Sequence, residues 1–317
     1  MSDFLIVKPF DIDNEAFISS NVPENDYPEW NSGTSYTLGQ RVIIINDTAS
    51  PPNGVHKIYE SLVGSNTGNN PLNDVQAPAG TPVYWIEVSS TNRWKMFDQL
   101  NSSQTIYPDE IDVELFIAQR PNSLSVLNVE AKTIQVIMYD TASPPNEVFN
   151  ETYTMIEPSG NPSYYNWFFQ QIQRKGNLYV KGLPPIAGGS VQVIIDNAGA
   201  NAKCGTLLVG YTEKYGETSV GSEIGIVDFS VKRQNEFGDF EILERAYSRE
   251  GRFTVLVPNN IVDKMQTLLA SRRATPTLYI ASELFESTYI YGFYIDMNNV
   301  IQYQNQSLLS IEVVGLT

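Results

Sequence analysis

The stretch Phe253-Thr-Val-Leu-Val-Pro-Asn-Asn-Ile-Val-Asp-Lys-Met-Gln-Thr-Leu-Leu269 contains both kinds of secondary structure that we expect in this chain. Its first five residues form an apolar run of strand length, which ends at Pro258. After the proline, apolar side chains recur at helical spacing: Ile261, Val262, Met265, Leu268 and Leu269. Asn259 or Asn260 is placed to cap this helix, and Arg272-Arg273 suit the negative end of its dipole. The stretch therefore predicts a strand followed by one clear helix.

Further strands are predicted after the helix, at 277–281, 289–295 and 308–314, so residues 206–317 are expected to form an α+β domain. In the middle one, alternate residues share a face: Tyr289, Tyr291, Phe293 and Ile295. Core or subunit interface is the favoured interpretation of this aromatic stripe, and a ligand platform is the alternative.

The rest of the chain is also predicted to be mainly β. Short apolar runs at 113–117, 134–138, 178–181 and 191–195 indicate a β-sandwich over residues 93–205. Residues 22–92 combine short apolar runs with Asn, Ser, Gly and Pro spacers, which is typical of a small all-β domain. Residues 1–21 are interpreted as an acidic N-terminal segment.

One sequence occurs twice: Asp47-Thr-Ala-Ser-Pro-Pro-Asn53 and Asp140-Thr-Ala-Ser-Pro-Pro-Asn146. Each copy follows an apolar run and precedes another. Asp bonds to its own backbone in turns, Pro-Pro fixes an extended corner and Asn tolerates a left-handed conformation. We predict two hairpin loops of the same design, with a ligand-binding role for the pair as the alternative.

Charge excludes several classes of function. The 317 residues include 36 acidic and 20 basic residues, a formal net charge of −16. Binding to nucleic acid or to an anionic membrane needs clustered Lys and Arg, so neither partner is expected. The first residues contain only four consecutive apolar positions, and no later run reaches the ~20 apolar residues of a membrane span. We expect a chain made in the cytoplasm, without membrane insertion.

Catalytic and metal-binding motifs are missing from the sequence. One cysteine, Cys204, and one histidine, His56, leave no set for a tetrahedral zinc site, and the run Asp11-Ile-Asp13-Asn-Glu15 lacks the Gly and Glu of a calcium loop. No nucleotide-binding glycine motif and no nucleophile elbow occur. We expect no metal, no cofactor and no enzymatic activity; a glycan-degrading enzyme with a carboxylate pair stays as a less favoured alternative.

The aromatic residues of the small domain are its most informative feature. Trp30, Trp85 and Trp94 fall in one stretch, with tyrosines nearby, and a unit of this size is not expected to bury them all. An exposed aromatic face is a natural platform for a sugar ring, with Asn and Asp side chains meeting the hydroxyls. A core role is equally expected for any one of these residues.

The same residues carry a resemblance to a known family. Trp30, then Tyr36-Thr-Leu-Gly39-Gln-Arg-Val42, then His56-Lys-Ile-Tyr59, Asn66-Thr-Gly68-Asn-Asn-Pro71 and Tyr84-Trp85 resemble, in order and spacing, small carbohydrate-binding modules of the chitin- and cellulose-binding type. The chain departs from that pattern at Gln40, where the family has Asp, and after Tyr59, where exposed tryptophans are missing. The resemblance implies sugar stacking by four residues: Trp30, Tyr36, Tyr59 and Trp85. A spacer or protein-contact role is the alternative.

A second resemblance concerns residues 85–317. The segments 91–98, 210–238 and 310–317 look like parts of tailed-bacteriophage virion proteins, which join a carbohydrate-binding module to β-rich tail-tip or baseplate domains. This resemblance implies that the chain is a virion structural protein of the tail and that it is assembled in the bacterial cytoplasm. Its partners would be other tail proteins, further copies of itself in a symmetric homo-oligomer, and host cell-surface polysaccharide. A tail connector without sugar binding is the alternative.

Overall fold

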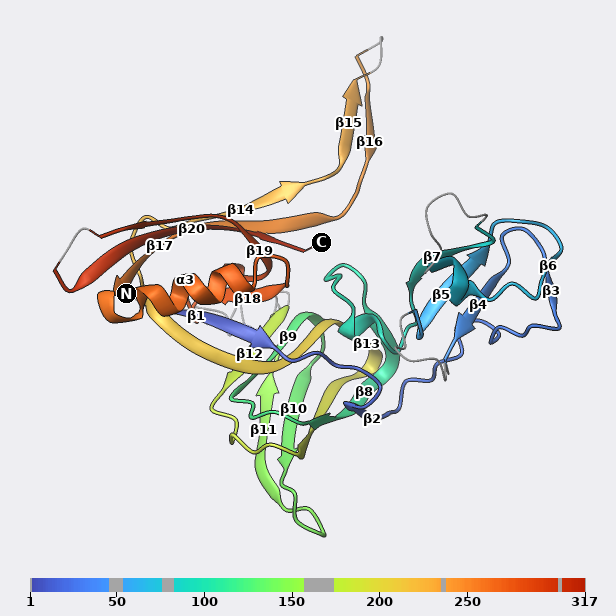
Figure 1. Ribbon diagram of the computed structural model, residues 1–317, viewed down its shortest axis with the longest axis horizontal. Helices are drawn as coiled ribbons and strands as arrows, with labels where there is room; N and C mark the ends of the chain where they lie inside the picture. Colours follow the sequence, from blue (N-terminus) through green and yellow to red (C-terminus); the bar gives the residue numbers. More distant parts are fainter. Residues whose placement is uncertain are drawn as a thin grey trace, which may run out of the picture.

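The computed structural model describes residues 2–45, 54–75, 83–156, 174–234, 238–301 and 304–316. The fold is mainly β, as predicted: 57% of the residues lie in strands and 8% are helical. Figure 1 shows a large body, a small domain at one side of it and a hairpin that rises away from the body. Four groups of buried apolar side chains lie in these parts.

The small domain consists of short antiparallel pairings around one apolar cluster. Its three-stranded sheet has the order β4 (Arg41–Ile44), β5 (Lys57–Ser61), β7 (Trp85–Ser90). Beside it lie the pair β3 (Ser35–Tyr36) and β6 (Asn66–Thr67) and the short helix α1 (Pro71–Val75). These elements all fall within the predicted range 22–92.

The body begins with a β-sandwich. One layer has the order β2-β8-β13-β10-β11 and the other is β12-β9-β13, because the two halves of β13 belong to different layers. Inward-facing residues of both layers share one buried cluster. The strands are β2 (Phe17–Ser20), β8 (Thr105–Ile117), β9 (Ser123–Glu130), β10 (Thr133–Tyr139), β11 (Glu147–Thr154), β12 (Asn177–Lys181) and β13 (Gly189–Thr218). The 3-10 turn η1 (Lys95–Phe97) precedes β8.

Strand β13 continues from the sandwich into the C-terminal part of the body. Its register with β8 shifts between Asp196 and Asn201, and its second half pairs with β9 and with β1 (Ser2–Pro9). The domain boundary predicted between residues 205 and 206 therefore lies inside one strand. Apolar runs interrupted by small and polar residues look like separate strands in the sequence, but here they belong to a single bent one.

The predicted N-terminal segment 1–21 also differs from expectation, because β1 is a central strand. Phe4 and Ile6 point into the C-terminal core, whereas Leu5 and Val7 belong to the cluster between this core and the sandwich. A strand buried on both faces is part of the folded body. The acidic residues of the segment do not prevent this, since Asp3 is half exposed and pairs with Lys214.

In the C-terminal part, successive strand pairings lead back to the strand at which they begin. The sequence β13-β1-β18-β19-β20-β17 closes through two residue pairs between β17 and β13, and its interior cluster includes Met265 and Leu269 of helix α3. The elements are β14 (Glu223–Asp228), β15 (Val231–Gln234), β16 (Phe240–Leu243), β17 (Tyr247–Pro258), η2 (Asn259–Ile261), α3 (Val262–Ser271), β18 (Thr277–Ile280), η3 (Glu286–Thr288), β19 (Tyr289–Val300) and β20 (Gln306–Gly315). The predicted strand, helix and following strands are confirmed.

The helix cap differs from the prediction. Asn259 begins the 3-10 turn η2, and Ile261 occupies the N-cap position of α3 without a side-chain hydrogen bond. The amide of Asn259 instead binds β20, where Ser307 Oγ donates to its Oδ1 at 2.6 Å. At the other end Arg273 Nη1 donates to the carbonyl of Ala270 at 3.1 Å, as its position after the helix suggested.

The second copy of the repeated sequence forms the predicted hairpin loop, because β10 and β11 pair on either side of residues 140–146. The Asp140 carboxylate accepts a bond from the side-chain amide of Asn146 at 2.9 Å and bonds from the backbone N–H of Asn146 and Ala142 at 2.8 and 2.9 Å, and these bonds lower its pKa. The first copy, 47–53, lies outside the described residues.

Candidate interaction surfaces

The four aromatic residues predicted to stack on sugar do lie together, but as a core. Tyr36, Tyr59 and Trp85 are 3%, 1% and 2% exposed, and Trp30 is half-buried against them. Tyr36 meets Trp85 edge-on, with ring centroids 5.2 Å apart. Trp85 Nε1 donates to the carbonyl of Asn69 and the Tyr59 hydroxyl to that of Gly54, so the polar atoms of these two residues are used inside the domain. Burial raises the pKa of Tyr59.

None of the described aromatic residues of 22–90 is exposed, although not all of them are buried. Two further tyrosines of residues 22–90, Tyr27 and Tyr84, are also only half-buried rather than exposed. The Tyr27 ring lies under the guanidinium of Arg41, 5.8 Å from its centroid, and its hydroxyl accepts a bond from Arg41 Nη1. The domain wraps its short strands around the rings, which replace the aliphatic residues of a larger core.

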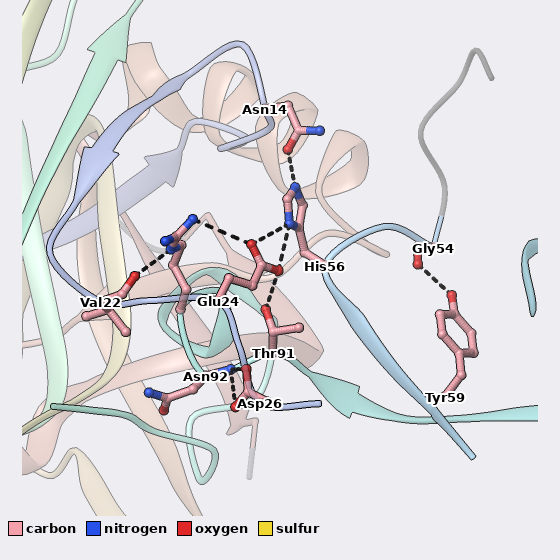
Figure 2. A network of polar contacts seen from close by, with 10 residues as sticks. Asn14, Val22, Glu24, Asp26, Gly54, His56, Tyr59, Thr91 and Asn92 are labelled. Carbon is pink, nitrogen blue, oxygen red and sulfur yellow. Dashed lines mark hydrogen bonds and ion pairs between the residues drawn. The ribbon is translucent and has the colours of Figure 1, made fainter. Parts of the chain in front are cut away.

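The junction between the small domain and the body holds a buried charged cluster that sequence reasoning missed. Figure 2 shows the carboxylate of Glu24, whose side chain is only 2% exposed, surrounded by donors. His56 Nδ1 lies 2.9 Å from Glu24 Oε1, Thr91 Oγ1 donates to the same oxygen at 2.7 Å, and Arg93 Nη1 lies 3.6 Å from Oε2. Glu24 precedes the small domain and Arg93 follows it, so the cluster joins the two connecting segments.

His56 also contacts the body directly. Its Nε2 lies 2.5 Å from Asn14 Oδ1, and its ring stacks on Trp94 with centroids 4.2 Å apart. This position of His56 was not predicted from the sequence. No local pattern indicates it, because the partners of Glu24 are 32 to 69 residues away in the sequence and become neighbours only in the fold.

A long hairpin projects from the edge of the body. We call residues 223–252 the arm: β14 pairs with the first half of β17, and beyond this ladder β15 pairs with β16. Figure 1 shows β15 and β16 standing clear of the rest of the chain. Internal bonds hold the bend, including Arg245 N–H to Ser230 Oγ at 3.0 Å and the ion pair of Lys232 with Asp228 at 2.8 Å.

The arm exposes large apolar side chains along its length. Seven of them are 46 to 66% exposed: Ile224, Ile226, Phe229, Phe240, Ile242, Leu243 and Tyr247. A two-stranded hairpin without its own core is marginal in water, and contiguous exposed apolar surface marks interaction sites. Apolar residues in strands usually face a core, so the exposure of these side chains is a finding of the structure.

Other classes of site find no support in the described residues. In the ranges that the structure describes, no three His, Cys, Asp or Glu side chains are grouped closely enough to hold a metal ion. None of the described helices is long and apolar enough to cross a membrane. No protein-family model matches the chain, and neither a curated protein nor a solved structure matches it.

Proposed function

We propose that this chain is a structural subunit of a bacteriophage tail tip or baseplate, and that it assembles with copies of itself through the arm. The observation that carries the proposal is the exposed apolar surface of the arm, which has no counterpart to cover it among the described residues of the same chain. The resemblance of segments 91–98, 210–238 and 310–317 to tailed-phage virion proteins supports the location in a tail.

The amount of exposed surface supports assembly as the role of the arm. Seven side chains of about 200 Å² each, exposed by roughly half to two thirds, present on the order of 800 Å². A standard protein interface buries about 800 Å² on each partner. The arm alone is thus large enough to make one specific contact.

The buried aromatic core favours the connector role over sugar binding. A sugar ring stacks on an exposed aromatic face, and three of the four residues implied by the resemblance are 3% exposed or less. We therefore propose that the small domain is a spacer or a protein contact, which the Glu24 cluster holds in a fixed position relative to the body.

Two measurements test this proposal. Mass spectrometry of purified phage particles is expected to find the chain in proportion to other tail proteins; its absence from the particles would refute the tail location. Light scattering after size-exclusion chromatography is expected to show a defined oligomer of the purified chain at tens of micromolar.

A polysaccharide array tests the role of the small domain. If the full chain binds the array and Trp30→Ala does not change this binding, the sugar-binding surface lies elsewhere.

A further inference from the structure

A second apolar surface lies at the base of the arm. It is a cleft of about 500 Å³ between the end of β13, the start of β14 and the segment that joins β18 to β19. Its apolar lining includes Val220, Ile224, Phe253, Ala281, Leu284 and Phe285. Val220 is 95% exposed and Leu284 82% exposed, so the cleft is as uncovered as the arm.

The free end of the arm has matching chemistry. We call β15 and β16 the tip. In their antiparallel register Gln234 lies opposite Phe240 and Lys232 opposite Ile242, so these four side chains share one face. That face offers two large apolar groups flanked by a lysine. Leu243 and Arg233 are on the other face.

Charge favours contact between tip and cleft. Five acidic residues are immediate chain neighbours of residues that line the cleft: Asp3, Glu217, Glu223, Glu283 and Glu286. Lys214 and Lys181 neutralise part of this charge in ion pairs with Asp3 and Glu283. Residues 229–249, in contrast, contain four acidic and four basic residues. In a chain of net charge −16, residues 229–249 thus form a neutral segment that another copy does not repel.

The tip does not reach the cleft of its own chain, because Figure 1 shows it pointing away from the body. We propose that the tip of one copy docks in the cleft of the next copy, with Phe240 and Ile242 against Leu284 and Phe285. Tip and cleft are different patches of one surface, so the contact is head-to-tail and leads to a ring if the rotation between copies closes. This inference rests on the proposed assembly role and specifies its interface.

A mixing experiment tests the pairing of the two surfaces. The tip variant carries Phe240→Ser and Ile242→Ser; the cleft variant carries Leu284→Ser and Phe285→Ser. All four residues are more than half exposed, so both variants are expected to retain the wild-type circular dichroism and Tm. Sedimentation velocity is expected to show self-association weakened at least about 30-fold for each variant alone.

An equimolar mixture of the two variants is expected to form a dimer and nothing larger, since one intact tip and one intact cleft remain. The matched control is Leu38→Ser with Leu62→Ser, two exposed leucines of the small domain, which are expected to leave assembly unchanged. A cross-link gives the contact independently: Ile242→Cys on one chain and Leu284→Cys on another are expected to form a disulfide. The native Cys204 does not interfere because it is buried.

The outcomes separate the two proposals. A wild-type chain that stays monomeric at 100 micromolar overturns both assembly through the arm and tip-in-cleft docking. A wild-type oligomer that the cleft variant retains overturns only the docking site. If each variant is monomeric and their mixture also stays monomeric, the contact joins like surfaces, and the head-to-tail arrangement is overturned.

Discussion

The carboxylate of Glu24 and the imidazole of His56 form a buried pair, 2.9 Å apart, at the point where the small domain meets the body. Glu24 also meets Thr91 and Arg93, and Arg93 Nε donates to the carbonyl of Val22 at 2.6 Å. The segments that enter and leave the small domain are thus tied to each other. A side chain that carries a full charge at 2% exposure is tolerated only because these donors surround it.

We expect Glu24→Gln to destabilise the junction by about 2–3 kcal/mol, because a neutral amide replaces the buried carboxylate that accepts the Thr91 hydrogen bond and pairs with Arg93. Hydrogen exchange of the backbone amides in 22–30 and 84–94 is the direct measurement. These amides are expected to exchange faster, while those of the sandwich core stay protected.

The control is Glu87→Gln, which removes the partner of Lys57 from an ion pair whose carboxylate is 40% exposed. Exposed pairs contribute about 0–1 kcal/mol, so this variant is expected to stay close to wild type. Equal effects of Glu24→Gln and Glu87→Gln on exchange would show that the junction cluster does not hold the domain.

Trp85 gives a second prediction, on the stability of the small domain. Trp85→Ala is expected to cost about 3–5 kcal/mol, because the indole is fully packed and its Nε1 donates to Asn69. Trp30→Ala is expected to cost less, since Trp30 is only half-buried. Urea unfolding followed by tryptophan fluorescence, with a separate transition for the small domain, checks the order. A milder effect for Trp85→Ala would argue against the core assignment.

The contrast between Trp85 and the C-terminal helix shows which features could be predicted from the sequence. The helix repeats its apolar residues locally, so Met265 and Leu269 were predicted to face a core and do so. Whether Trp85 is exposed depends on contacts with Tyr36, far away in the chain, and the aromatic pattern alone is equally compatible with a platform. Three of the four residues expected to stack on sugar turned out to be core residues.

Non-local pairing also explains why the place of β1 in the body was not predicted. Val7 of β1 pairs with both Thr212 and Leu278, each more than 200 positions away in the sequence. No periodicity within β1 reveals partners at such separation. Acidic composition favoured the interpretation of residues 1–21 as a separate segment, although the four apolar residues Phe4–Val7 bury its strand in the body.

Gly292 of β19 gives a third prediction. A Cβ built there would lie 2.0 Å from the carbonyl oxygen of Val314, which belongs to the neighbouring strand β20. Backbone atoms of a central strand do not move away easily, so Gly292→Ala is expected to cost about 2 kcal/mol or more of the free energy of unfolding. Gly64→Ala is the matched control, because no atom lies within 4 Å of the added Cβ. Thermal unfolding of both variants checks the difference; a similar Tm for the two would contradict the close approach of β19 and β20.

Cys204 gives the last prediction, on alkaline stability. Its thiol is fully buried in the sandwich core, and burial raises its pKa to about 12. In the unfolded chain the thiol ionises near pH 8.5. A pKa that is higher in the folded state means that the unfolded chain loses the proton first. The buried, protonated thiol of Cys204 therefore makes its full contribution to the free energy of unfolding below about pH 8.5. This contribution is lost as the pH rises toward 12.

The free energy of unfolding in urea is expected to fall between pH 8.5 and 10, and to fall less steeply for Cys204→Ala. Burial also raises the pKa of Tyr289 and Tyr291 to about 12, so a residual slope is expected above pH 10, where unfolded tyrosines ionise. A disulfide reagent at pH 8 reports the same burial, because only the thiolate reacts and the folded chain keeps the thiol protonated and covered. Labelling is expected to follow the rate of unfolding in urea. Immediate labelling of the native chain would contradict the burial of Cys204 and, with it, the packing of the two sandwich layers on each other.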